Sequence, residues 1–193
     1  ESRQGANNPK SDWYIWRPAK PDGSPPNNWG SFFSGSAWQY DDQRGEYYLH
    51  LFSKKQPDLN WENEDVRRSV YEMMNWWLDR GIAGFRMDVI TFISKQPGLP
   101  DGFQAPGHEF GDGFSQVVNG PRLYEFLQEM HREVFADRSG TFTVGECGGF
   151  TPEVARVVTD PAQAMLDMGF HFEHTGIDSV GSKWNRTPFD LLK

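Results

Sequence analysis

Two short apolar runs of this chain each contain a carboxylate near their end, and one of them also contains an arginine. The run at 82–90 includes Arg86 and Asp88, and the run at 141–146 ends in Glu146. Both runs are typical of buried strands, and residues two apart on a strand share a face, so Arg86 and Asp88 should point the same way. Two carboxylates held close together suit glycosyl transfer, in which one attacks or stabilises the anomeric carbon and the other protonates the leaving oxygen.

Other site chemistries have less support. A buried structural ion pair is the alternative for Arg86 and Asp88, although removing two charges from water is costly. Phosphate and serine-hydrolase sites are not indicated, because the sequence contains no GxxxxGK[ST], GxGxxG or GxSxG pattern. His171 and Glu173 could share a strand face, but His174 would point away, so no metal or other cofactor is predicted.

The elements that must position the two acids alternate between helix and strand. A helix is predicted over 64–80, with Asn63 as its cap and Gly81 as its left-handed stop. The apolar residues expected on its buried face are Val66, Val70, Met73 and Trp77. Because a buried strand follows this helix at once, the pair forms half of a repeating α/β unit.

The second half of the chain repeats this order. A helix is predicted from Asn119, its expected cap, with Leu123, Leu127, Met130 and Val134 on one face. A short helix over 152–159 with Thr151 as its cap and a strand over 165–173 follow the run at 141–146. This order implies parallel strands with right-handed crossovers, which bring carboxyl ends to one edge. The segment 94–118 is too long for an ordinary connection and is expected to cover a functional site.

The first 48 residues are rich in Asn, Pro, Gly and Trp and show little helical or strand periodicity. They are too aromatic for a disordered linker, so an ordered segment packed by its own aromatic side chains is predicted. Within and just after it, the alternating residues 47–52 are expected to form a strand that pairs with 37–40 across a turn at 41–45.

The composition limits the classes of function. The 193 residues fit one large domain or part of a bigger one, and 27 acidic against 19 basic residues give a net charge of −8, which argues against a nucleic-acid partner. Aromatic residues make up 15% of the chain and suit stacking on sugar rings, although core packing explains some of them. The sequence has no membrane-span-like run, no signal-like start and only Cys147, interpreted as a small buried filler, so a soluble, cytoplasmic protein is expected.

Three motifs carry a resemblance to a known family. QPDLN at 56–60, GFRMDVI at 84–90 and VGE at 144–146 resemble motifs of the α-amylase superfamily, glycoside hydrolase family 13, and their surroundings resemble its oligo-1,6-glucosidase and α-glucosidase branch. The resemblance covers nearly the whole chain and implies an α/β fold, namely a partial TIM (β/α)8 barrel, about strands 4 to 6, plus the inserted loop-rich B domain. Residues 1–60 would be the B-domain-like segment of loops and short strands, and residues 61–193 the central part of the barrel.

The resemblance also implies roles for individual residues. Asp88 matches the nucleophile and Glu146 the general acid/base of a retaining double-displacement mechanism. Arg86 matches the arginine beside the nucleophile, where an adjacent cation lowers a carboxylate pKa. Phe52 resembles a B-domain aromatic that packs on bound glucose, and Phe172 is expected on the sixth strand, facing the pocket.

Linkage preference is expected to depend on Val89, the residue after the nucleophile. Val at this place resembles enzymes that act on α-1,6 bonds, whereas Thr or Ala resembles those that act on α-1,4 bonds. The implied activity is hydrolysis of α-glucosidic bonds, with the α-1,6 type in isomalto-oligosaccharides favoured and an isomaltose- or maltose-type substrate. An α-1,4-glucosidase and a sucrose- or trehalose-type transglycosylating isomerase stay open as alternatives.

Some family motifs do not occur in this sequence. The Asp-x-x-x-Asn-His motif of the third barrel strand and the Asn-His-Asp motif of the seventh are absent, so the chain is expected to be the middle of a barrel and inactive by itself.

Two interpretations from other functional classes remain. One is a catalytically silent relative, and the other is a sugar-binding module, although the α/β alternation differs from the β-sandwich usual for such modules.

Overall fold

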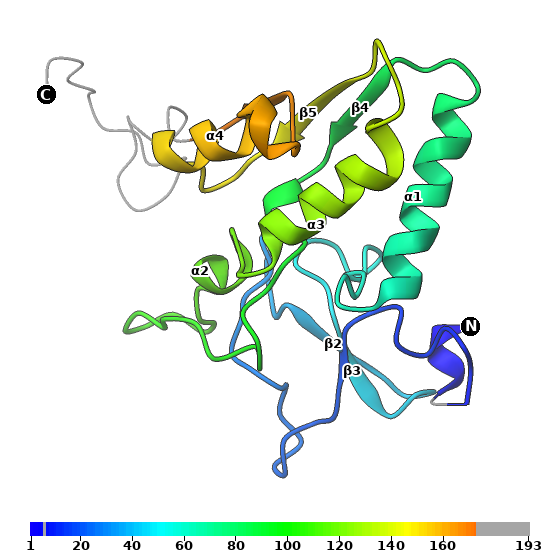
Figure 1. Ribbon diagram of the computed structural model, residues 1–193. Helices are drawn as coiled ribbons and strands as arrows, with labels where there is room; N and C mark the ends of the chain where they lie inside the picture. The colour runs from blue at the N-terminus through cyan, green and yellow to red at the C-terminus, as the bar shows by residue number, and fades with distance from the viewer. Residues whose placement is uncertain (6, 173–193) are drawn as a thin grey trace, which may run out of the picture.

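The computed structural model describes residues 1–5 and 7–172, which form two three-stranded sheets and four α-helices (Figure 1). An antiparallel sheet has the order β1-β3-β2, and a parallel sheet has the order β4-β5-β6. The strands are β1 (Trp16–Arg17), β2 (Trp38–Asp41), β3 (Glu46–Leu49), β4 (Gly84–Met87), β5 (Phe142–Glu146) and β6 (Met168–Phe170). The helices are α1 (Glu64–Leu78), α2 (Phe114–Val117), α3 (Leu123–Met130) and α4 (Pro152–Val158). The expected α/β fold with parallel strands is confirmed.

The antiparallel sheet forms as predicted from the aromatic alternation. Trp38 of β2 pairs with Leu49 of β3, and a turn at 42–45 joins the two strands. The strand expected over 47–52 stops at Leu49. His50 N still donates to the carbonyl of Ala37 at 2.8 Å, but Leu51 N leaves the ladder and donates to the carboxylate of Asp58 at 2.8 Å. Trp29, with no exposed surface, lies in the core beside this sheet.

The assignment of residues 1–60 to a B-domain-like segment stays a prediction. The core around the antiparallel sheet also includes Phe92, Leu99 and Val117, which come from the long connection after β4. The N-terminal segment and this connection therefore share one apolar cluster.

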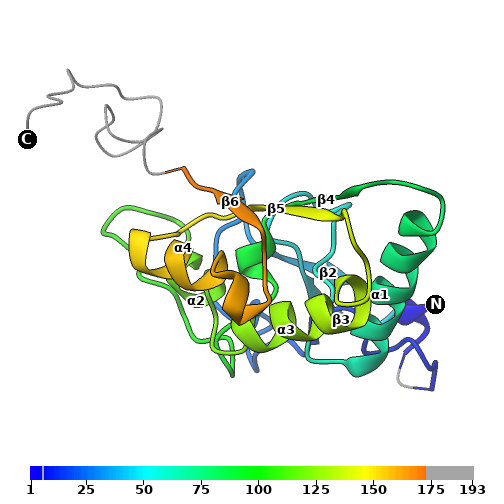
Figure 2. The ribbon, with the colours of Figure 1, turned by 45° about the horizontal axis from the view of Figure 1, so that its top comes forward.

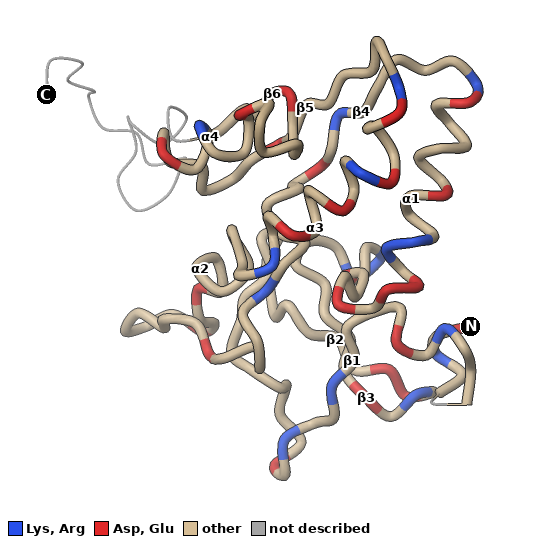
Figure 3. Tube along the Cα trace, viewed as in Figure 1, with Lys and Arg blue, Asp and Glu red and all other residues tan. Residues whose placement is uncertain are grey.

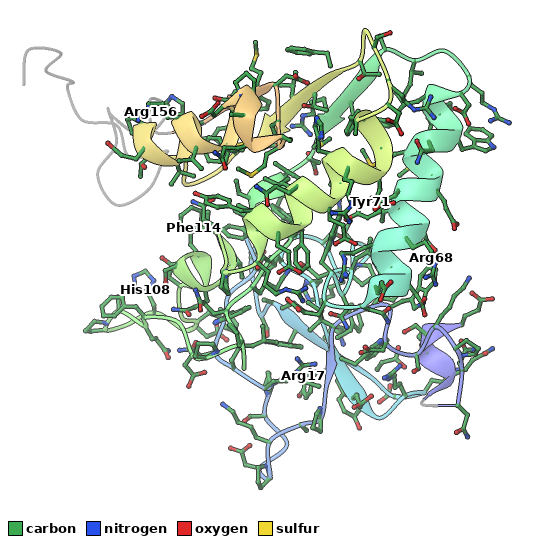
Figure 4. All side chains as sticks on the ribbon, viewed as in Figure 1. Arg17, Arg68, Tyr71, His108, Phe114 and Arg156 are labelled. Carbon is green, nitrogen blue, oxygen red and sulfur yellow. The ribbon has the colours of Figure 1, made fainter. Side chains whose placement is uncertain are left out.

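Helix α1 begins where the sequence predicts. Asn63 accepts a hydrogen bond from Asp65 N at 2.8 Å, which satisfies one of the free N–H groups at the helix start. The predicted buried face is only partly right. Val66 is buried as predicted, but Met73 and Trp77 are 47% and 45% exposed. The other apolar residues that the helix buries are Tyr71, Met74 and Leu78. Apolar residues occupy two stripes of this helix, and the stripe that packs toward α3 is the one that includes Tyr71, labelled in Figure 4.

Helix α3 begins later than predicted. Its first residue is Leu123 and its N-cap position is Arg122, with no side-chain cap. Asn119 is therefore not a helix cap. It has a left-handed backbone with φ 49°, and its side chain contacts the chain that follows β5. The predicted apolar face is correct, because all four of its residues are buried: Leu123, Leu127, Met130 and Val134.

The parallel sheet is covered by helices on one side (Figure 2). Thr143 and Cys147 of the β5 segment are buried on the helix side, with 2% and 0% exposure, whereas Phe142 and Met168 on the other side are 47% and 51% exposed. Helix α4 has the predicted cap, since Thr151 accepts from Val154 N at 3.3 Å. Strand β6 is shorter than the expected 165–173, and the part of that prediction beyond residue 172 lies outside the described residues.

Among the described helices, none combines the length and the apolar character that a membrane crossing requires.

Candidate active site

The two acids lie at the carboxyl ends of neighbouring parallel strands. Met87 pairs with Gly145 at the last rung of the β4-β5 ladder, Asp88 directly follows β4, and Glu146 is the last residue of β5. Arg86 donates hydrogen bonds to both carboxylates, through Nη1 to Asp88 and through Nη2 to Glu146. Figure 3 shows the basic and acidic segments next to each other where β4 ends. The fork of one guanidinium thus holds the predicted pair together.

The three charged groups differ in exposure. The side chain of Glu146 is 15% exposed, whereas those of Arg86 and Asp88 are 49% and 73% exposed. The hydrogen bond from Arg86 holds the pKa of Asp88 below its usual range, and the two carboxylates raise the pKa of Arg86. Asp88 is therefore ionised at neutral pH. Because Arg86 and Asp88 are well solvated, their pairing contributes more to their orientation than to stability.

Val89 adopts a backbone conformation that is rare for its residue type. Its φ and ψ are 37° and 43°, in the left-handed region, and it precedes the 3-10 turn η2 (Ile90–Phe92). A β-branched side chain is unfavourable there, and such strain persists only where the surrounding structure fixes it. Val89 packs against the apolar cluster that contains Phe92 and Phe114. The predicted specificity residue is thus held directly beside Asp88.

Phe52 belongs to an aromatic cluster rather than standing alone. Its ring stacks on Phe32 with centroids 5.3 Å apart and on Phe92 at 6.3 Å, and Phe33 approaches its edge at 5.5 Å. Phe114 of α2, labelled in Figure 4, closes the cluster against Phe92 at 5.9 Å. Since Phe92 follows Asp88 by four residues, this cluster connects the N-terminal segment to the chain beside the acids.

Phe172 lies two residues beyond β6, so the strand expected to hold it ends before it. Its ring meets that of Phe170 edge-on at 5.7 Å, and the guanidinium of Arg86 lies 5.6 Å from the centre of the Phe170 ring. Sequence reasoning missed Phe170, although the alternation of Met168, Phe170 and Phe172 could have placed it on the same face.

Asp58 and Lys95 form a largely buried ion pair. Asp58 of the 56–60 motif binds Lys95 Nζ at 2.9 Å, and the two side chains are only 14% and 7% exposed. Lys95 also donates to the carbonyl of Phe92 at 3.0 Å. The motif therefore ties the chain after β3 to the chain after η2.

Cys147, next to Glu146, is fully buried, as its interpretation as a small filler requires. Burial, with a smaller effect of the Glu146 charge, raises the pKa of its thiol to about 12. A thiol protonated at neutral pH is a poor nucleophile and a poor metal ligand. Within residues 1–5 and 7–172 no three potential metal ligands gather, and Glu173 and His174 fall outside these ranges.

Two polar residues that bind the chain after Glu146 were also missed as site residues. Thr91 in η2 is 1% exposed and donates through Oγ1 to the carbonyl of Gly148 at 2.9 Å. Asn119 donates through Nδ2 to the carbonyl of Gly149 at 2.9 Å. The Asn119-Gly120 dipeptide signals a left-handed turn, but no sequence pattern indicates which carbonyl its side chain would meet.

Comparison with known proteins identifies relatives of this chain. The model of the alpha amylase catalytic domain matches residues 1–193. An oligo-1,6-glucosidase of Parageobacillus thermoglucosidasius is 57% identical over 192 residues, which cover 99% of this chain and 34% of that protein. The crystal structure of Bacillus licheniformis trehalose-6-phosphate hydrolase, mutant R201Q, superposes with a TM-score of 0.91 at 46% identity and covers 100% of this chain and 34% of its own.

A structure of isomaltulose synthase mutant E295A from Erwinia rhapontici NX5 has a TM-score of 0.86 at 37% identity and covers 98% of this chain and 33% of its own. The chain thus spans about a third of the length of the relatives that it matches.

Proposed function

The chain belongs to the α-amylase family, and from this premise we propose that the full-length protein hydrolyses α-glucosidic bonds of short oligosaccharides, with the α-1,6 bonds of isomalto-oligosaccharides as its preferred target. The observation that carries the proposal is the hydrogen bonding of Arg86 to both Asp88 and Glu146 at the ends of adjacent parallel strands. The similarity to the Parageobacillus oligo-1,6-glucosidase supports the choice of linkage.

In the proposed mechanism Asp88 is the nucleophile. Its carboxylate attacks the anomeric carbon as the bond to the leaving oxygen breaks, which gives a covalent glycosyl-enzyme. Glu146 donates its proton to the departing oxygen in this step. It then takes a proton from water as the water attacks the anomeric carbon and releases Asp88. Two displacements at one carbon retain its configuration.

Arg86 supports the different roles of Asp88 and Glu146. Because it holds the pKa of Asp88 low, Asp88 remains an anion that can attack, and because it also binds Glu146, it orients both acids toward the scissile bond that they flank. The greater burial of Glu146 agrees with a group that works against the leaving oxygen while it is shielded from water.

Aromatic rings supply the proposed contacts to the sugar. Phe52 offers a partly exposed ring at the edge of the aromatic cluster, and Phe170 and Phe172 offer rings that are 37% and 42% exposed beside Arg86. Flat apolar faces of glucose pack on such rings. We assign these three residues to substrate binding and Val89 to the choice of linkage.

Glucose release from isomaltose and from maltose tests the proposal, with the full-length protein and its Asp88→Asn variant. Faster release from isomaltose, abolished in the variant, supports the α-1,6 assignment. Faster release from maltose would replace it with an α-1,4-glucosidase, and turnover retained in Asp88→Asn would remove Asp88 from its role. Binding of either sugar without turnover would favour a silent relative or a sugar-binding module.

A transglycosylating isomerase is the second candidate, favoured by the similarity to isomaltulose synthase. Hydrolysis and isomerisation differ in the acceptor that attacks the glycosyl-enzyme, which is water in one and a sugar hydroxyl in the other. Sucrose as substrate separates them, since an isomerase yields a new disaccharide whereas a hydrolase yields free glucose and fructose.

A cytoplasmic location forms part of the proposal and rests on the single thiol of Cys147; fractionation of the producing cells tests it.

A further inference from the structure

Asp88 and Glu146 lie between two connections that join the same pair of chain segments. On one side is the β4-β5 ladder, whose last paired residues are Met87 and Gly145. On the other side, three residues after Asp88 and two after Glu146, the hydroxyl of Thr91 donates to the carbonyl of Gly148 at 2.9 Å. The acids are thus bracketed by a backbone ladder and by a side-chain hydrogen bond.

The second connection continues into the long segment 94–118. Asn119, at its end, donates from its backbone N to the carbonyl of Thr91 at 2.9 Å and from Nδ2 to the carbonyl of Gly149 at 2.9 Å. One threonine and one asparagine therefore bind two successive carbonyls of the chain that follows Glu146. We call this set, Thr91 and Asn119 with the carbonyls of Gly148 and Gly149, the polar bridge.

The polar bridge restrains two consecutive glycines of the chain that follows Glu146. Gly148 and Gly149 have no side chains to limit their backbone, and Gly149 is left-handed with φ 71°. The segment after Asp88, by contrast, is fixed by the turn η2 and by the apolar packing of Ile90 and Phe92. If the bridge were lost, the chain after Glu146 would move more than the chain after Asp88.

We propose that Thr91 and Asn119 are positioning residues, which set the placement of Glu146 relative to Asp88 by binding the Gly148 and Gly149 carbonyls. The proposal rests on the proposed function, since it assigns Glu146 the delivery of a proton to the leaving oxygen. A general acid acts only within hydrogen-bond reach of that oxygen, and a misplacement of about 1 Å can cost roughly 100-fold in rate.

The test compares a substrate that needs the acid with one that does not. Isomaltose has a poor leaving group, whereas a 2,4-dinitrophenyl α-glucoside leaves with little protonation. In the full-length protein, Thr91→Val removes the hydroxyl but keeps the shape. We expect kcat/KM on isomaltose to fall about 10-fold or more, because a misplaced Glu146 delivers its proton poorly. The value of kcat/KM on the aryl glucoside should fall much less. Thr91→Ser, which restores the donor, should recover the wild-type ratio of the two values.

Thr143→Val is the matched control. Thr143 is about as buried as Thr91 and donates through Oγ1 to Asp167 at 2.8 Å, but it lies at the amino end of β5, away from the acids. This variant should lower the unfolding midpoint and leave the ratio of the two kcat/KM values unchanged. Should Thr91→Val fail to fold, Asn119→Asp serves in its place, because Asp tolerates the left-handed backbone and removes the donor to Gly149.

The outcomes distinguish failure of the positioning role from failure of the proposed function. Equal losses on both substrates, or no loss on either, would overturn the positioning role while the wild-type activity leaves the proposed function standing. Absence of glucose release by the wild-type full-length protein would instead refute the proposed function itself.

Discussion

Arg86 and Glu146 are 60 residues apart in the sequence, yet the guanidinium of the first donates a hydrogen bond to the carboxylate of the second. The parallel pairing of β4 with β5 makes this contact possible, because it places Arg86 opposite Val144 and brings the two carboxyl ends to the same edge. The contact makes one cation common to both proposed catalytic acids.

Substitution of Arg86 should move the acid limb of the pH profile. Asp88 must be ionised to attack, and Arg86 holds its pKa below the usual value of about 3.9. In Arg86→Met this pKa should rise, so the acid limb of kcat/KM should shift to higher pH, and Arg86→Lys should shift it less. Arg122→Met serves as the control, because Arg122 pairs with Glu62 and Glu125 away from the site. If the acid limb of kcat/KM stayed at the same pH in both Arg86 variants, Arg86 would not control the pKa of Asp88.

The pairing of Arg86 with Asp88 should also make the stability of the fold depend on pH. Because the pKa of Asp88 is lowered on folding, its contribution is present above about pH 3.9 and is lost as the pH falls through the lowered value. The effect should be small, since the carboxylate is well exposed.

Val89 lends itself to two substitutions with separate readouts. Val89→Asn should raise the free energy of unfolding by about 1 kcal/mol, because Asn tolerates the left-handed backbone that strains a β-branched residue. Val89→Thr keeps the branching and should change the isomaltose-to-maltose ratio of kcat/KM by roughly 10-fold, the scale of a methyl-sized contact. Urea unfolding and glucose release measure the two effects. A destabilised Val89→Asn would show that apolar packing outweighs the backbone strain.

Asp58 and Lys95 form a largely buried pair, so removal of one partner should be costly. Asp58→Asn leaves the Lys95 ammonium without its counter-ion and should reduce the free energy of unfolding by about 3 kcal/mol. The double variant with Lys95→Met should regain part of this loss, since it leaves no buried charge. Glu133→Gln, at the exposed Arg132–Glu133 pair, should change stability by less than about 0.5 kcal/mol. Equal costs at the two pairs would contradict the structural role assigned to Asp58.

Cys147 should resist alkylation in the folded protein. The thiol has no exposed surface and its pKa is raised to about 12, so little thiolate exists at neutral pH. Iodoacetamide at pH 8 should modify it only after denaturation, as mass measurement of the intact protein would show. Rapid modification in the native state would mean that the chain after Glu146 opens, which the polar bridge should prevent.

Local patterns predicted much of this fold. The Asn63 and Thr151 caps, the predicted apolar face around α3 and the pairing of β3 with β2 each follow from neighbouring residues, and each was confirmed. The buried face of α1 was partly wrong, because two stripes fit a helical period and only the docking of α3 selects between them. Asn119 was misassigned for a similar reason, since its side chain binds Gly149, 30 residues away.

In the candidate site, too, some residues could be predicted from local sequence and others could not. Asp88 and Glu146 could be found from carboxylates at the ends of apolar runs, and the parallel strand order indicates that they meet. The hydrogen bonds of Thr91 and Asn119 could not be found in this way, because Thr91 has no special neighbours in sequence and its partner is a backbone carbonyl 57 residues away. Interactions with backbone atoms leave no complementary residue for a pattern to reveal.

The parallel pairing of β4 and β5 also bears on the order of folding. Strands β2 and β3 are joined by a tight turn and need only a short loop to close, whereas β4 and β5 meet only after the long connection and α3 have been gathered between them. Closing such a long loop is slow, because its entropy is lost before the strand contacts form. We therefore expect pulsed hydrogen exchange during refolding to protect the amides of β3 before those of β5, so that Asp88 and Glu146 become neighbours late, when most of the surrounding chain is already in place.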